Sequence, residues 1–377
     1  MSRPTLNLPG ALLRKRSRIP DLSRIKAGEC PAGMLLPFAL EIPVRSYLNH
    51  AFPLSIVDQI AGCRPYLYES FIQVFFPHRK EDYDRFLMLP SLTVEGWEEM
   101  GLLRTRVIDT HSRGLSRPPA LIELLTEGIA DGYYAEIHID EYFLPGRPCY
   151  GNTHSVHDNM IIGYEWPEKV FHVAGYGADY EVAPMGFEDV LRAFYHMPRN
   201  EMARRYLRLI KPRKTPSRPF DLEAVRRQLS DYLNSRASLT PRQMRRKPLY
   251  WKARRFTGEW GVQSYQALQD YLAEMSRQGR PLDLRATRTL WEHKSCMLER
   301  LRYLEEQGRF RDGRLFSFSY APVESGARML RFQAYQYNSG GFKREDLEEA
   351  AAQLQCMKET EAAVLSEVLD SLHPAGS

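Results

Sequence analysis

The chain has 377 residues, 43% of them hydrophobic and 26% charged, and a net charge of +5. This length predicts two or three domains, and the composition is that of a soluble globular protein. The small charge and the lack of a nucleic-acid motif argue against a nucleic-acid partner. No apolar run approaches the ~20 residues that a membrane helix needs. The five scattered cysteines form no CxxC pair, which argues against disulfides and structural zinc. We therefore expect a cytoplasmic protein without a bound metal.

Composition changes along the chain and predicts four segments. Residues 1–33 are basic and rich in proline and glycine, and we expect a loosely ordered arm. Residues 34–210 mix strand and helix patterns, which predicts an α+β domain. The run KPRKTPSRP at 211–219 has no apolar periodicity and is interpreted as a linker. Residues 220–377 carry helical periodicity and predict a helical domain.

The centre of the first domain is expected to be a β-hairpin over residues 157–174. Two β-branched and aromatic runs flank the turn residues 165–168, which combine glutamate and proline. His154 and His157 stand at the start of this hairpin, where a strand end exposes side chains to solvent or to a cleft. One of them could be a general base, but from periodicity alone ordinary surface or hydrogen-bonded histidines are the more common case.

Further elements of this domain are expected from local patterns. A buried strand is expected over 35–44, and a helix over 119–129. A short helix near 47–62 should have its N-cap near His50, because proline at position 53 suits a first turn. Gln73 lies in an apolar segment, where it is either a satisfied buried amide or an oxyanion-hole donor.

Residues 134–143 alternate as a strand with one apolar face. The other face gathers Glu136, His138 and Asp140. This face is either solvated or, if it lines a cleft, equipped for acid–base chemistry.

The second domain is expected to contain helices over 221–233, 262–278, 284–307 and 345–372, the first capped by Asp221. Within the 284–307 helix, Leu290, Met297, Leu301 and Leu304 predict the buried face. Lys294 falls inside this stripe and His293 on its edge. We expect the lysine to meet a carboxylate across the domain interface or to extend past the edge of the stripe. Alternatively, both side chains face a cleft between the domains.

The run YFLPGRPCYGNTHSVHDNMIIGYEWPEKVFHVAGY at 142–176 resembles papain-like domains of bacterial natural-product assembly, as in butirosin-type aminoglycoside acyltransferases. The run LDLRATRTLWEHKSCMLERLRYL at 282–304 resembles a helix found with such domains in petrobactin-type siderophore condensing proteins. The resemblance implies a papain-like α+β domain with a helical domain. It implies acyl transfer from an acyl or peptidyl carrier protein to an amine, such as a polyamine or amino sugar. The chain itself would bind no cofactor, because the phosphopantetheine arrives on the carrier protein. His157, six residues before Gly163, matches the catalytic histidine.

The chain departs from this family at two positions. The nucleophilic cysteine should stand at a helix N-terminus, but residues 49–51 are Asn, His and Ala, and Cys63 lies at the other end of that helix. The acid expected near Gly175 is also missing, and Asp140, Asp158 or Asp179 could replace it.

Two mechanisms remain open. A carrier-bound thioester is already activated, so His157 could deprotonate the amine directly. In that mechanism Asp140 or Glu136 would orient the imidazole of His157 or hold a cationic acceptor. Alternatively, Cys149 is the nucleophile, unless it is simply a small buried side chain. The candidate substrate-binding residues are His154, Glu136, His50, Gln73, His293 and Lys294.

A catalytically inactive scaffold that binds a carrier protein or a biosynthetic partner is the second hypothesis for function. The basic run at 242–255 suits the acidic surface of carrier proteins. It could equally be a solvated basic segment.

Overall fold

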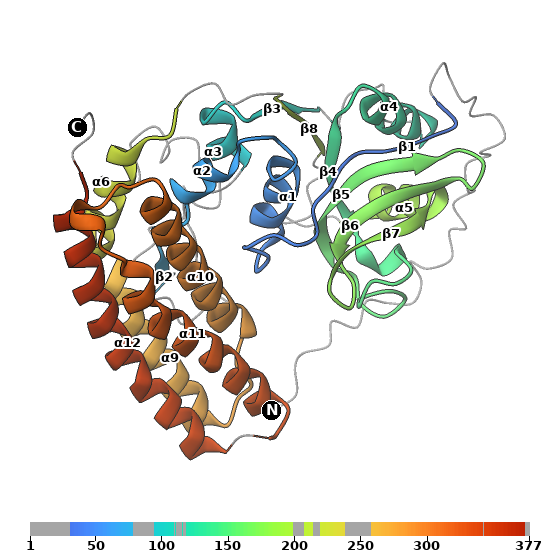
Figure 1. Ribbon diagram of the computed structural model, residues 1–377. Coiled ribbons are helices and arrows are strands. Elements are labelled where there is room, and N and C mark those ends of the chain that lie inside the picture. The colour runs from blue at the N-terminus through green and yellow to red at the C-terminus, as the bar shows by residue number, and fades with distance from the viewer. Residues whose placement is uncertain are drawn as a thin grey trace. The chain divides into compact units, whose positions relative to one another are not determined.

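The computed structural model describes residues 31–77, 94–108, 110, 115, 118–198, 207–213, 219–237, 258–341 and 343–373. The chain forms an antiparallel sheet unit and a largely helical unit, which makes it an α+β protein (Figure 1). The sheet unit comprises residues 1–36 and 106–210, and the helical unit comprises 37–105 and 211–377. This division differs from the expected domains because residues 37–105 group with the helices. The basic run at 242–255, linker residues 214–218 and nearly all of the predicted arm lie outside the described residues.

The sheet unit is built on antiparallel strands in the order β8-β4-β5-β6-β7. Strand β1 pairs with residues 163–165 at the C-terminal end of β5, beyond Ile161, where the pairing of β5 with β4 ends. Two helices, α4 and α5, contribute to the same hydrophobic core as one face of these strands. The bounds are β1 Gly33–Leu35, α4 Pro118–Ala130, β4 Tyr134–Asp140, β5 Val156–Glu165, β6 Val170–Tyr176, β7 Tyr180–Gly186, α5 Phe187–Tyr195 and β8 Leu207–Pro212, with a short 3-10 helix, η4, at Glu141–Phe143.

The predicted central hairpin is confirmed as β5 and β6. Its turn ends at Lys169, whose φ of 52° lies in the left-handed region. At Gly163 the register shifts, and β1 approaches so closely that a Cβ would lie 2.6 Å from the carbonyl oxygen of Met34. A glycine is therefore needed there for β1 to pair with β5.

Within its described residues, the helical unit contains four long helices, α9, α10, α11 and α12. Helix α11 contacts α10 and α12, and α12 also contacts α9 and α6. The expected core face of α10 is confirmed, because Leu290, Met297, Leu301 and Leu304 are buried. The bounds are α1 Leu48–Val57, α2 Arg64–Tyr68, β2 Phe75–Pro77, α3 Val94–Glu99, α6 Leu222–Leu233, β9 Gly258–Trp260, η5 Gly261–Gln263, α9 Ser264–Gln278, α10 Leu284–Glu306, η6 Arg311–Gly313, α11 Phe316–Asn338 and α12 Arg344–Ser371. Strand β3 (Leu103–Val107) carries the chain from this unit into the sheet unit.

Several local expectations need correction. The strand expected over 35–44 is wrong, because regular pairing stops at Leu35 and two prolines that lack an N–H follow. Helix α1 begins after Tyr47, so His50 lies inside the helix and is not its N-cap. Residues 211 and 212 of the expected linker belong to β8, which continues to Pro212. Helix α11 was not expected at all.

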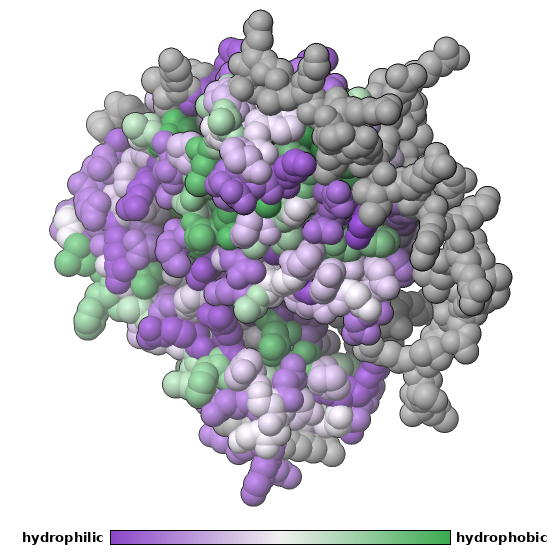
Figure 2. Space-filling view, turned by 90° about the vertical axis from the view of Figure 1, so that its right-hand side faces the viewer, coloured by the Kyte–Doolittle hydropathy of each residue, from purple (hydrophilic) through white to green (hydrophobic). Residues whose placement is uncertain are grey.

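The cap of α6 follows the sequence closely. The side chain of Asp221 accepts a hydrogen bond from the N–H of Ala224, as predicted. None of the described helices is long and apolar enough to cross a membrane. The face drawn in Figure 2 is mostly hydrophilic, with apolar residues in separate small areas.

Candidate functional site

The register between β4 and β5 decides which polar side chains of the sheet can meet. His138 stands opposite Asp158, and Ile139 stands opposite His157. Directly opposed residues point to the same face, and successive residues alternate. His157 therefore shares a face with the core residue Ile139, whereas Glu136, His138 and Asp158 share the other face. The structure does not bring His157 together with Glu136.

Asp140, at the end of β4, holds a different histidine from the one expected. Its carboxylate is completely buried and accepts a 2.6 Å hydrogen bond from Nδ1 of His154. The backbone N–H groups of Ser155 and Tyr142 also donate to it, at 3.0 and 3.2 Å. These three donors hold the carboxylate in a fixed orientation.

The imidazole of His154 is oriented but still accessible. Its side chain is 46% exposed, and the ring of Tyr142 stacks on it with centroids 4.2 Å apart. Because Nδ1–H donates to Asp140, the neutral ring presents its lone pair at Nε2. A buried carboxylate that fixes the tautomer of a half-exposed imidazole is the arrangement of a general base.

His157 contacts a second acid, Glu141, with 3.4 Å between Nδ1 and Oε1. Glu141 is buried and lies within hydrogen-bonding distance of Asn159, which in turn accepts from Arg147. Burial lowers the pKa of His157, but the hydrogen bond and charge of Glu141 outweigh it, so the pKa is raised. His157 is thus better suited to hold a proton than to remove one.

The other polar residues of β4 form ion pairs along the sheet. His138 Nε2 lies 2.6 Å from Asp158, and the hydrogen bond and charge of the histidine outweigh burial to lower the pKa of that carboxyl. Glu136 is buried and pairs with Arg208 at 2.7 Å. Because the guanidinium occupies this carboxylate, we interpret Glu136 as structural and not as a substrate ligand.

Cys149 lies in the turns between η4 and β5, five residues before His154. Its carbonyl accepts the N–H groups of Asn152 and Thr153, both at 3.1 Å. Among the described residues its thiol has no hydrogen bond to a histidine. No activating base is therefore in place for Cys149 as a nucleophile.

Four other predicted site residues lie in the helical unit. His50 is buried, with its ring edge-on to Tyr47 and Phe71 at 6.0 Å. The amide of Gln73 is buried and donates to the carbonyls of Arg236 and Gln228, at 3.2 and 3.4 Å. Because the Nε2 donor of Gln73 is already bonded to these two carbonyls, it is not available as an oxyanion-hole donor.

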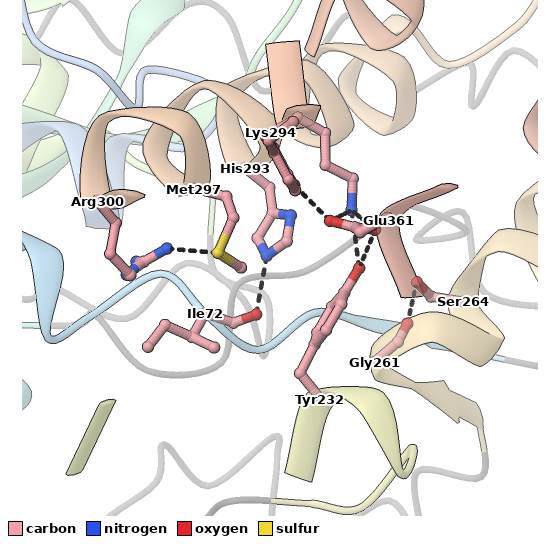
Figure 3. Close-up of polar contacts among 10 residues, drawn as sticks. Ile72, Tyr232, Gly261, Ser264, His293, Lys294, Met297, Arg300 and Glu361 are labelled. Carbon is pink, nitrogen blue, oxygen red and sulfur yellow. Dashed lines mark hydrogen bonds and ion pairs between the residues drawn. The ribbon is translucent and has the colours of Figure 1, made fainter. Parts of the chain in front are cut away.

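His293 and Lys294 belong to a closed polar cluster (Figure 3). Lys294 is completely buried, and its Nζ lies 2.8 and 3.0 Å from the carboxylate oxygens of Glu361. It also donates to the hydroxyl of Tyr232 at 2.7 Å. The expected carboxylate partner of Lys294 thus exists, but it comes from α12 of the same unit and not from across a domain interface.

The rest of the cluster stays neutral. Burial and the charge of Glu361 raise the pKa values of Tyr232 and Tyr320 well above 10.0. Both hydroxyls therefore donate to Glu361. Burial, aided by Lys294, lowers the pKa of His293 well below 6.5, and the neutral ring donates from Nε2 to the carbonyl of Ile72 at 2.8 Å. His293, Lys294 and Glu361 are all buried, so we interpret the cluster as a stabilising contact between helices and not as the lining of an open cleft.

Sequence reasoning missed Tyr142, Glu141 and Glu361 as partners of the predicted residues. A signal existed for Glu361. It interrupts the helical stripe of buried residues Leu354, Met357, Leu365 and Val368 on α12, as Lys294 does on α10. Two opposite charges in apolar stripes of one unit can satisfy each other. Glu141 gave no such signal, because it directly follows the alternating strand.

No three His, Cys, Asp or Glu side chains converge as a metal site within the described part of the chain. No known protein family matches the sequence, and no curated protein matches it as a relative.

Proposed function

We propose that this protein is an acyltransferase that moves an acyl group from a carrier-protein thioester to an amine, forming an amide. The observation that carries the proposal is the pair of buried Asp140 and half-exposed His154. The thioester donor and amine acceptor rest on the resemblance of residues 142–176 to papain-like acyltransferases of natural-product assembly. An α+β chain with an antiparallel sheet unit and a helical unit is compatible with that fold.

His154 replaces His157 as the general base in this proposal. Its Nε2 takes a proton from the amine as the amine nitrogen attacks the thioester carbonyl carbon. The imidazolium that forms is stabilised by the carboxylate of Asp140. The C–S bond then breaks, and His154 returns the proton to the phosphopantetheine thiolate. Such proton transfer contributes roughly 10²–10⁴-fold to the rate.

The neighbouring histidine has a different role. Because Glu141 raises the pKa of His157, a protonated imidazole is available to hold a carbonyl or anionic oxygen of the substrate. The missing cysteine at 49–51 is then no obstacle, since direct transfer needs no acyl-enzyme and proximity alone can supply ~7–11 kcal/mol.

The test uses the full chain, an acyl-loaded carrier protein and a panel of polyamines and amino sugars, with amide product measured by mass spectrometry. His154→Gln and Asp140→Asn should lower turnover by ~10²–10⁴-fold. The control is His172→Gln, because His172 also pairs with a carboxylate, Glu165 at 2.9 Å, at the turn end of the same hairpin. This control should retain activity.

Three results would change the assignment. Full activity in His154→Gln with loss in His157→Gln would move the base to His157. An acyl adduct on Cys149 in the intact protein would indicate a covalent mechanism. Absence of product across the panel, with carrier protein still bound, would favour the inactive scaffold.

A further inference from the structure

Helix α11 exposes an apolar stripe on the side away from its core face. Phe318 is 85% exposed, Met329 54% and Phe332 55%. The opposite side of the helix is buried, through Tyr320, Val323, Ala327, Leu330 and Ala334. At the two ends Leu315 and Tyr335, 67% and 60% exposed, extend the apolar area.

The spacing of this stripe is regular. The exposed positions follow one another at intervals of four and three residues. They are Phe318, Pro322, Ser325, Met329 and Phe332, and Ser325 is the one small polar residue among them. Such 4-3 spacing forms the seam along which one helix packs against another. Single exposed apolar residues are ordinary, whereas a contiguous row on one helix marks an interaction surface.

We propose that this stripe is the interface of a symmetric dimer, in which α11 packs antiparallel against α11 of a second copy. The stripe is self-complementary about its centre. Ser325 lies seven residues from Phe318 and seven from Phe332. A two-fold axis near Ser325 therefore brings Phe318 of each copy toward Phe332 of the partner subunit, as an isologous interface requires. The small serine side chain at the crossing permits a close approach of the two helices.

The charges beside the stripe are arranged to match. Glu324 and Arg328 lie on the same flank of α11, one turn apart. Equal flanks meet in an antiparallel pair, so Arg328 of each copy comes within about one turn of Glu324 of the partner subunit. Glu324 is held in place by the indole N–H of Trp291, at 2.8 Å. A parallel arrangement would instead set this flank against the opposite flank of the partner subunit, so that the two charged flanks would not meet.

The available area sets the strength of the dimer. A fully buried aromatic side chain covers ~150–250 Å². The exposed parts of Phe318, Phe332 and Tyr335 together equal about two whole side chains, so they supply roughly 300–500 Å² per copy. With Leu315 and Met329 added, the pair of copies buries on the order of 1,000 Å², the lower limit for a specific interface. A weak dimer is expected, with a dissociation constant in the micromolar range.

Sedimentation velocity across micromolar protein concentrations tests this dimer. The wild-type chain should shift from monomer to dimer as concentration rises, and Phe318→Glu and Phe332→Glu should stay monomeric with unchanged circular dichroism. Val107→Glu is the control, because Val107 is 64% exposed on the sheet unit and its substitution should leave the dimer intact. A wild-type monomer at all concentrations, or a dimer unaffected by both phenylalanine variants, would overturn the proposal. The first result would point to another occupant of the stripe, such as residues 1–30 of the same chain.

A cysteine cross-link tests the register separately. In a background that carries Cys30→Ser, Cys149→Ser and Cys356→Ser and so keeps only the two buried cysteines Cys63 and Cys296, Ser325→Cys should form a covalent dimer under mild oxidation, because the two-fold axis brings the two thiols together. Ser319→Cys is the matched control, also exposed but about a third of a turn around the helix from Ser325. Equal cross-linking at both positions, or none at Ser325→Cys, would contradict the antiparallel arrangement. Neither measurement depends on the proposed acyltransferase activity.

Discussion

At the scale of single residues, Lys294 and Glu361 show how a buried charge is tolerated. Each is completely buried, and each has the other as its ionic partner. Removing one partner leaves an uncompensated buried charge, which costs ~3–5 kcal/mol. Lys294→Met and Glu361→Leu should each lower the stability of the helical unit by about that amount, as measured by denaturant midpoints. The double variant should recover much of the loss, and simple additivity of the two losses would show that the pair is not coupled.

His293 makes stability depend on pH in a defined direction. Its folded-state pKa is depressed well below the unfolded value of 6.5, so the unfolded chain binds a proton first as the pH falls. The contribution of neutral His293 to the free energy of unfolding is fully present above pH 6.5. Below that pH it is lost, and the free energy of unfolding falls by up to about 1.4 kcal/mol per pH unit. His293→Gln, which keeps a donor for Ile72, should show a shallower decline in urea midpoint between neutral and mildly acidic pH.

The raised pKa of His157 acts in the opposite sense. Its contribution is present below the unfolded pKa and is lost as the pH rises through the folded one. The informative quantity is therefore the difference between wild type and His293→Gln at each pH. Identical pH profiles for the two proteins would mean that His293 is not a buried neutral group.

At the scale of elements, the turn before α9 depends on a glycine with no room for a side chain. Gly261 has φ +55°, and a Cβ there would lie 2.0 Å from the carbonyl oxygen of Tyr232. Gly279, the C-cap of α9, has a similar φ of +59° but nothing within 4 Å. Gly279→Ala should thus lower the free energy of unfolding only by the cost of placing an alanine in the left-handed region, ~1–2 kcal/mol. Gly261→Ala should cost clearly more, because α6 or η5 must also move. Equal losses in thermal stability would contradict this account.

Elements with clear local signals could be predicted from sequence, whereas a helix with an internal proline and the contacts set by strand register could not. The β5–β6 hairpin and α6 with its Asp221 cap follow local signals. Helix α11 was missed because Pro322 lies inside it, where proline normally ends a helix. The pairing of Asp140 with His154, and not with His157, depends on the chain path after β4 and on the β4–β5 register, neither of which a single sequence specifies.

At the scale of the whole molecule, the chain passes between its two units three times, near residues 36, 105 and 210. Each unit nevertheless has buried apolar residues of its own. Ile137 lies in the core of the sheet unit and Leu301 in that of the helical unit, both completely buried. Proteins with separate cores commonly unfold in more than one step. We therefore expect two thermal transitions by differential scanning calorimetry.

Matched variants assign these transitions. Ile137→Ala and Leu301→Ala remove comparable apolar groups and should each cost ~2–5 kcal/mol, but each should lower a different transition. Lys294→Met should move the same transition as Leu301→Ala, because both act on α10. If either core variant shifts both transitions equally, or if one transition accounts for the full enthalpy, the two units unfold as one cooperative structure. Separate transitions would instead allow the His154–Asp140 site to remain folded when the helical unit has lost its buried ion pair.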